Sequence, residues 1–427
     1  MLDRVTPPSI KPLSKIQFPR PEILTLSNGI NVYLFDTGTQ DVVSIEMIFC
    51  AGSWFQHQAF TAMVTNMMLR EGTKNYTAQQ LAEKLDFYGA HFENTTERDN
   101  AYVALYTLNK HLHQTLPLLA EIVKNPVFPE YELKVLAGKQ KQLLEVNRQK
   151  VNYLARANFN PIIFGKLHPY GMNPEPEELN KVTREMLANF HQSYYHSGKC
   201  SIVVAGKIHP ETKELLEQHL GNNNWNGTLP KQAEFQFEGA EIKNHFIQKE
   251  GAMQSAIRLG CRMFDRKHPD FAGMKVLNTI LGGYFGSRLM TNLREDKGFT
   301  YGIGSSIIPL RKSGYFVISG EVGADATDES LGEINSELYR LCDELVPENE
   351  LSLIRSYLAG EMLRAIDGPF ALAGLYRELI EDGLDYLHLE NLIETVQHIT
   401  APELRNLAIR YLNPDSLYTL VVGPERK

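Results

Sequence analysis

The sequence predicts an α+β fold made of two homologous modules, each a mainly antiparallel sheet with helices packed on one face. The first observation is a repeat: Thr183 and Thr400, 217 residues apart, each begin an amphipathic helical pattern that a buried strand follows. Those strands end at Gly206 and Gly423, which have the same offset. The second observation is that strand patterns precede helical patterns in each half, as in α+β proteins.

The third observation is a segment rich in Asn and Gly, with no apolar period, that separates the two halves. It predicts an N-terminal domain over residues 1–220, a linker over 221–240 and a C-terminal domain over 241–427. A second match, between Phe60–Met63 and Phe271–Met274, places similar segments near the start of each half.

Alternating and continuous apolar runs predict the strands, and apolar residues at helical spacing predict the helices. In the first half the expected strands are 30–35, 42–49, 101–108 and 201–206, and the expected helices 78–88, 111–122, 130–156 and the one after Thr183. In the second half the strands are 245–249, 256–262, 301–308, 314–322 and 418–423, and the helices 328–345, 348–366 and the one after Thr400. Thr400 and Glu403 form a capping-box pattern.

The composition excludes several classes of protein. The net charge is −8, and no basic stripe interleaved with aromatic residues is present, so we expect no nucleic-acid partner. No apolar run approaches the roughly 20 residues of a membrane span, so we expect no membrane partner. The first 20 residues show no leader pattern, which favours the cytoplasm.

Common catalytic motifs are missing from the sequence. It contains no phosphate-binding GxxxxGK[ST] loop and no GxSxG nucleophile turn. It also contains neither HExxH nor HxxEH, the helical motifs in which two His residues bind zinc and a Glu serves as general base.

Two stretches resemble the M16 peptidase family, which includes pitrilysin, insulinase and the mitochondrial processing peptidase. The first joins LTLSNGINVYLFD (24–36) and AGSWFQ (51–56) to a helix that ends in REGT (70–73). The second joins LNTILGG (277–283) and SRL (287–289) to LREDKGFTYG (293–302). The resemblance covers about residues 24–423 and implies the same duplicated layout.

The sequence departs from this family at the zinc motif. Alignment on the flanking segments puts Met63 and Met67 at the two His positions of HxxEH, and Asn66 at the Glu position. A thioether is a poor ligand for Zn²⁺, and an amide cannot take a proton from water. The family's third ligand, a Glu on a later helix, corresponds to Glu145, but one carboxylate will not hold zinc. We therefore expect no metal in this chain, and interpret Met63, Met67 and Met68 as helix packing.

The family's Arg–Tyr pair is retained. The resemblance implies that Arg294 and Tyr301 reach an active site from the domain opposite the zinc, where they hold substrate and stabilise the oxyanion. Both side chains carry donors suited to a developing negative charge. The alternative is a surface ion pair for Arg294 and a core position for Tyr301. The family's substrate-binding edge strand corresponds to Gly89–Asn94, where Glu93 replaces an Asn.

These observations predict a non-catalytic partner subunit of a heterodimeric M16 zinc peptidase. An HxxEH-bearing paralogue would supply Zn²⁺ and the general base, and this chain would add Arg294, Tyr301 and a chamber wall for peptide substrates. The alternative is a structural or peptide-binding scaffold with no part in catalysis, in which the Arg–Tyr pair is a leftover.

Overall fold

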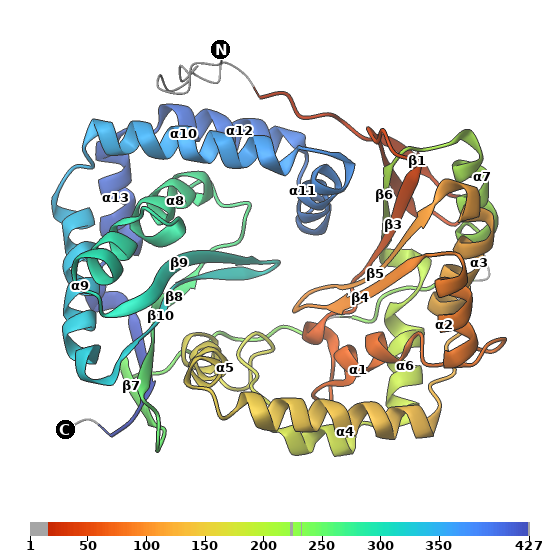
Figure 1. Ribbon diagram of the computed structural model, residues 1–427, viewed down its shortest axis with the longest axis horizontal. Helices are drawn as coiled ribbons and strands as arrows, with labels where there is room; N and C mark the ends of the chain where they lie inside the picture. The colour runs from red at the N-terminus through yellow and green to blue at the C-terminus, as the bar shows by residue number, and fades with distance from the viewer. Residues whose placement is uncertain (1–15, 223–224, 232, 426–427) are drawn as a thin grey trace, which may run out of the picture.

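The computed structural model describes residues 16–222, 225–231 and 233–425. Most of the N-terminal segment on which the predicted compartment rests, residues 1–15, lies outside these ranges. Within them, no helix combines the length and the apolar composition that a membrane crossing requires. The chain forms two sheets that face each other, with helices around them (Figure 1).

The first sheet has the strand order β1-β2-β6-β3-β5-β4, and all its neighbours are antiparallel except β2 and β6. Its strands are β1 (Glu22–Thr25), β2 (Asn31–Asp36), β3 (Val42–Phe49), β4 (His91–Thr96), β5 (Ala101–Leu108) and β6 (Cys200–Gly206). The helices of this half are α1 (Thr61–Met68), α2 (Ala78–Phe87), α3 (Leu112–Lys124), α4 (Glu130–Asn147), α5 (Val151–Phe164), α6 (Arg184–Tyr194) and α7 (Pro210–Leu220).

The second sheet has the order β7-β11-β8-β10-β9, and its one parallel pair is β7 with β11. Its strands are β7 (Asn244–Gln248), β8 (Gln254–Met263), β9 (Thr300–Leu310), β10 (Ser313–Gly323) and β11 (Tyr418–Gly423). Its helices are α8 (Phe271–Asn278), α9 (Thr327–Asp343), α10 (Glu348–Ala365), α11 (Pro369–Asp382), α12 (Tyr386–His398) and α13 (Ala401–Tyr411), with short π-helical segments η6 (Thr279–Gly283) and η7 (Met290–Asp296).

The two sheets repeat one topology, which confirms the predicted pair of modules. The order β2-β6-β3-β5-β4 matches β7-β11-β8-β10-β9 strand for strand, including the parallel pair. Thr183 and Thr400 are the N-cap residues of the closing helices α6 and α13, as predicted, and each Thr side chain accepts a backbone N–H in the first turn. Thr400 and Glu403 form the predicted capping box.

Each sheet carries its own helices on one face and one helix of the other half on the opposite face (Figure 1). Helix α5, from the first half, packs on β8 and β11 of the second sheet. Helix α11, from the second half, packs on β6 and β2 of the first sheet, and their buried side chains form a separate apolar core, which includes Phe35, Val203, Leu372 and Leu379. The modules therefore exchange helices and bury apolar surface reciprocally.

One predicted helix is wrong in extent. The segment 130–156 is not one helix, because α4 ends at Asn147 and α5 begins at Val151. Lys150 has an extended backbone between them, with φ −93° and ψ 130°. The break lets α5 turn away from α4 and pack on the second sheet. This packing is a long-range contact, which the local pattern of apolar residues cannot predict.

Candidate functional site

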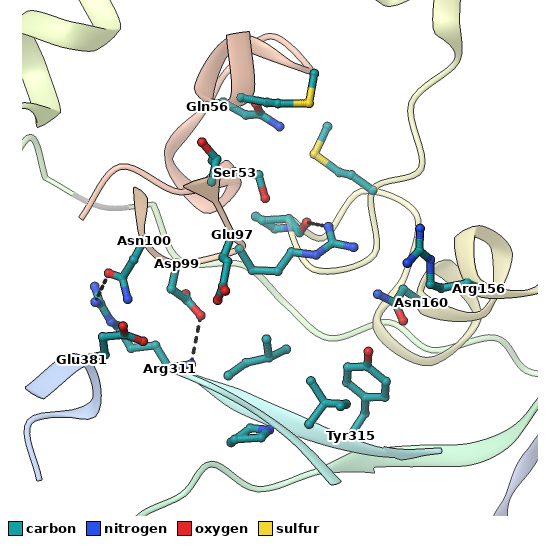
Figure 2. A pocket seen from close by; sticks show the side chains of 18 of the residues that line it. Ser53, Gln56, Glu97, Asp99, Asn100, Arg156, Asn160, Arg311, Tyr315 and Glu381 are labelled. Atoms are coloured by element: carbon teal, nitrogen blue, oxygen red, sulfur yellow. Dashed lines mark hydrogen bonds between the residues drawn. The ribbon is translucent and has the colours of Figure 1, made fainter. Parts of the chain in front are cut away.

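A cavity of about 840 Å³ lies between the two halves, and both halves line it (Figure 2). The first half contributes the segment before α1, the β4–β5 loop at 97–100 and part of α5. The second half contributes the tip of the β9–β10 hairpin, at 308–311, and the end of α11. This volume falls in the usual range of ligand-binding clefts.

Helix α1 presents one of its methionines to this cavity. Met63 lines the cavity and is half-buried, and Met67, one turn later, is also half-buried. Met68 is fully buried in the core. Met68 is a core residue, as the packing interpretation predicts, and Met63 both packs against that core and adds an apolar, uncharged wall to the cavity.

Asn66 is built into the fold rather than facing the cavity. Its side chain is 1% exposed, and its Nδ2 donates to the Tyr102 carbonyl oxygen at 3.3 Å and to the Tyr195 hydroxyl at 3.0 Å. Its backbone oxygen accepts from the Asn94 amide, which joins α1 to β4. Burial raises the pKa of the Tyr195 phenol, and the hydrogen bond with Asn66 acts in the opposite direction. Tyr195 is therefore a neutral hydrogen-bond partner at neutral pH.

Glu145 is paired within its own helix. Its side chain is 53% exposed, and its Oε1 lies 3.9 Å from Lys141 Nζ, one turn earlier on α4. Within the described residues, no group of three or more His, Cys, Asp or Glu side chains is arranged to hold a metal ion. Two thioethers, a buried amide already used as a donor and one exposed carboxylate do not fit Zn²⁺.

The Arg–Tyr pair lies away from the larger cavity, on neighbouring elements of the second half. Arg294, on η7, places its guanidinium carbon 4.6 Å from the ring centroid of Phe285, which is 63% exposed. Tyr301, near the start of β9, is 92% exposed, so a core position for it is excluded. It lines a second cavity of about 290 Å³, between α5 and the strands β8, β9 and β10.

The strand predicted as a substrate-binding edge is β4, which ends the first sheet and pairs with β5. It contacts α1, and the Asn94 side chain donates to the Asn66 carbonyl oxygen. His91 and Glu93 on this strand are exposed, and His91 Nε2 lies 2.9 Å from Glu93 Oε1. Edge strands offer unpaired backbone groups to an added strand.

Several polar residues of the cavity were not predicted from the sequence. Arg311, at the tip of the β9–β10 hairpin, joins the halves: its backbone N–H donates to Asp99 Oδ2 at 3.1 Å and its Nη2 to Asn100 Oδ1 at 2.6 Å. Its Nη1 lies 3.2 Å from Cys50 Sγ. The only local sequence signal for this site is the polar tip of the hairpin. That signal does not predict which residues the tip contacts.

Comparison with known proteins places the chain in a family. A model described as "Insulinase (Peptidase family M16)" matches residues 31–167, and one described as "Peptidase M16 inactive domain" matches residues 181–358. An uncharacterized zinc protease of Rickettsia felis is 24% identical over 94% of this chain and 97% of its own length. The beta subunit of the human mitochondrial-processing peptidase is 22% identical over 96% of this chain and 86% of its own.

Solved structures show the same fold. A crystal structure described as a peptidase M16 inactive domain from Pseudomonas fluorescens has a TM-score of 0.84 and 24% identity, over 95% of this chain and 98% of that one. A protease from Helicobacter pylori has the same TM-score with 19% identity, over 95% and 100%. The periplasmic protease PqqL from Escherichia coli has a TM-score of 0.78 and 15% identity, over 98% of this chain and 48% of its own. With both modules matched in sequence and the whole fold matched in structure, this chain belongs to the M16 peptidase family.

Proposed function

We propose that this chain is the non-catalytic subunit of a two-chain M16 zinc peptidase. The observation that carries the proposal is an asymmetry between the two halves. The first half has lost the donors for zinc and the general base, and Asn66 is buried as a structural residue. The second half keeps Arg294 and Tyr301 within the LREDKGFTYG segment, with Tyr301 fully reachable by a partner.

The surroundings of the Arg–Tyr pair support a role against another chain. Phe285 and Tyr301 are exposed aromatic side chains, and the Arg294 guanidinium lies over Phe285 rather than in an ion pair, within the described part of the chain. Tyr and Arg are the residues most enriched at interface hot spots, where the partner removes them from water. An HxxEH-bearing paralogue would bring the zinc and the base that this chain lacks.

In the proposed complex, Arg294 and Tyr301 act on a peptide bound at the partner's zinc. The guanidinium and the phenol O–H are donors, and they would stabilise the negative charge that develops on the scissile carbonyl oxygen. The cavity between the halves would form part of a chamber wall. The cytoplasm stays the expected compartment, although a structural neighbour is named as periplasmic; cell fractionation decides between the two.

The test is a mixture of this chain with an HxxEH-bearing paralogue from the same genome. Hydrolysis of a quenched fluorescent peptide should require both chains. Combining Arg294→Ala with Tyr301→Phe should lower kcat/KM about 100-fold or more, since loss of one oxyanion donor costs on that order. The matched control combines Arg364→Ala with Tyr339→Phe, on helices α10 and α9, and should leave the rate unchanged. An unchanged rate for the first variant rejects the role in catalysis.

One observation favours the alternative, a peptide-binding or structural scaffold. Strand β4 ends the first sheet and could accept a peptide as an additional strand through backbone groups alone. Under this alternative, the chain binds an extended peptide without any paralogue, and the Arg294 and Tyr301 substitutions change nothing. Isothermal titration with the isolated chain, followed by the two-chain activity assay, separates the two functions.

A further inference from the structure

Three arginines gather around one tyrosine at the boundary of the two cavities. Arg98 comes from the β4–β5 loop, Arg156 from α5 and Arg258 from β8, so three separated elements supply them. Each of them interacts electrostatically with Tyr315 on β10. Figure 2 shows Arg156 and Asn160 beside the phenol of Tyr315, at the end of the cavity opposite Arg311.

These arginines lack the neutralising partners that two other arginines of the cavity have. Arg266 and Arg377, which line the same cavity, lie 2.8 Å from Asp382 and 2.9 Å from Glu46. By contrast, no carboxylate in the described ranges pairs with Arg98, Arg156 or Arg258 at ion-pair distance. The Arg98 guanidinium donates a hydrogen bond of 3.4 Å to the Pro169 carbonyl oxygen. The guanidinium carbon of Arg156 lies 5.6 Å from the centroid of the Tyr153 ring. Neither partner carries a negative charge that would offset the charge of the arginine.

Acidic side chains also line the two cavities, among them Glu97, Asp99 and Glu321, and the last two accept hydrogen bonds. Asp99 accepts from the Tyr170 hydroxyl at 2.7 Å and from the backbone N–H of Arg311 at 3.1 Å. Glu321 lines the smaller cavity together with Arg258, but accepts from the Asn152 amide at 2.8 Å. Burial raises the pKa of Tyr315 and the charges of these three arginines lower it, whereas no carboxylate in the described ranges acts on it, so positive charge exceeds negative charge around this phenol.

The charge of Arg156 opposes the charges of the other two arginines. Burial lowers the pKa of Arg98 and of Arg258, and the charge of Arg156 lowers both further; Tyr315 acts in the opposite direction on both, and Asp99 on Arg98. Partly buried charges of one sign are unfavourable unless an opposite charge joins them. The Tyr315 hydroxyl and the Asn160 amide are further donors on the same side.

We propose that Arg98, Arg156 and Arg258, with Tyr315 and Asn160, form a binding site for the carboxylate of a peptide. The site is open to ligands, because Arg156 is exposed and the cavity of about 840 Å³ has room for several residues. A guanidinium binds a carboxylate through two parallel hydrogen bonds, which gives both affinity and orientation. An apolar wall that includes Phe60, Met63 and Leu144 would receive neighbouring side chains. The choice of a peptide as the ligand rests on the proposed function. The positive charge of the site is independent of that function.

The experiment measures binding of fluorescein-labelled octapeptides of Ala, Leu and Ser to the purified full chain by fluorescence anisotropy. The three probes are a peptide with a free C-terminal carboxylate, its C-terminal amide, and the amide with one internal Glu. We expect the free acid or the Glu peptide to bind at least 10-fold more tightly than the plain amide. Preference for the free acid identifies a peptide terminus as the ligand, and preference for the Glu peptide identifies an acidic side chain.

Variants locate the site. Arg156→Gln removes an exposed charge with little demand on folding, and should reduce the 10-fold preference to about 2-fold; Arg258→Gln should act in the same direction. Arg364→Gln, on α10, is the matched control and should keep the full preference. Equal binding of all three peptides, or the same preference in Arg156→Gln, overturns the proposal.

A second measurement separates this proposal from the proposed function. Replacing chloride by inorganic phosphate at equal ionic strength should raise the Tm of the wild type and of Arg364→Gln more than that of Arg156→Gln. If no peptide binds and this difference remains, the anion site stands while the role in peptide handling fails. If no peptide binds and phosphate shifts every variant equally, the anion site is rejected as well.

Discussion

We expect Glu381 to make the stability of this chain depend on pH. It lies near the end of α11, lines the central cavity and has a side chain that is 16% exposed. The pKa of this carboxyl is raised from 4.5 to about 7; burial is the largest cause, and the charges of Glu97 and Asp382 contribute to the rise. The Tyr102 hydrogen bond and the Arg377 charge act against the rise, but Arg377 is nearer to Glu46, at 2.9 Å, than to Glu381, at 3.4 Å.

The sign and size follow from proton linkage. Between pH 4.5 and about 7 the folded chain binds more protons at Glu381 than the unfolded chain does, so the free energy of unfolding falls as the pH rises. The contribution is fully present below pH 4.5 and is lost as the pH passes through about 7. Each tenfold change in proton affinity is worth 1.36 kcal/mol, so the total is at most about 3 kcal/mol.

The perturbation is Glu381→Gln, which keeps the shape and removes the titration. The free energy of unfolding in urea is measured for the wild type and the variant at pH 5, 6, 7 and 8. The difference between the two proteins at each pH removes the contribution of every other titrating group. We expect the variant to gain up to about 3 kcal/mol over the wild type between pH 5 and pH 8. Glu378→Gln, on the same helix, is the control and should keep the pH dependence of the wild type, because Glu381 is still present. A difference between Glu381→Gln and wild type that stays constant over this range refutes the reasoning.

Three further substitutions test the fold. Asn66→Asp removes the donor to the Tyr195 hydroxyl and buries a charge. The free energy of unfolding in urea at pH 7 should therefore fall by about 3 kcal/mol. An unchanged or higher value would mean that the hydrogen bonds of Asn66 do not stabilise the fold. Leu372→Ala, in the core between α11 and the first sheet, should cost about 3 kcal/mol by the same measurement, and a loss below 1 kcal/mol would contradict this packing. Thr400→Ala should lower stability by about 1 kcal/mol in thermal unfolding through loss of its capping box with Glu403, and no change would show that the cap is dispensable.

Local patterns were sufficient to predict the repeat. The helices after Thr183 and Thr400 and their buried strands depend on capping and on apolar period, both of which are short-range signals. The extent of α4 and α5 could not be predicted in this way. Nothing at residues 148–150 resembles a strong helix breaker, and the chain turns there because α5 packs on the other sheet.

In the candidate site, too, local motifs could be predicted from the sequence and long-range contacts could not. Met63, Asn66 and Met67 were found from the sequence because they occupy one motif. That Asn66 bonds to Tyr195 depends on residues 129 positions apart, which no pattern brings together. The arginines around Tyr315 come from three elements of two modules, so only the folded chain reveals that their charges meet.

The exchange of helices α5 and α11 also limits how the chain can move. Swinging the two modules apart like a clamshell would lift α11 off β2 and β6 and α5 off β8 and β11, and would expose two apolar surfaces to water at once. Such a motion costs free energy, so we expect the two modules to move as one rigid body. In a two-chain enclosure, the passage of a peptide would therefore depend on how far the two chains separate, and a hinge between the modules of this chain would contribute little.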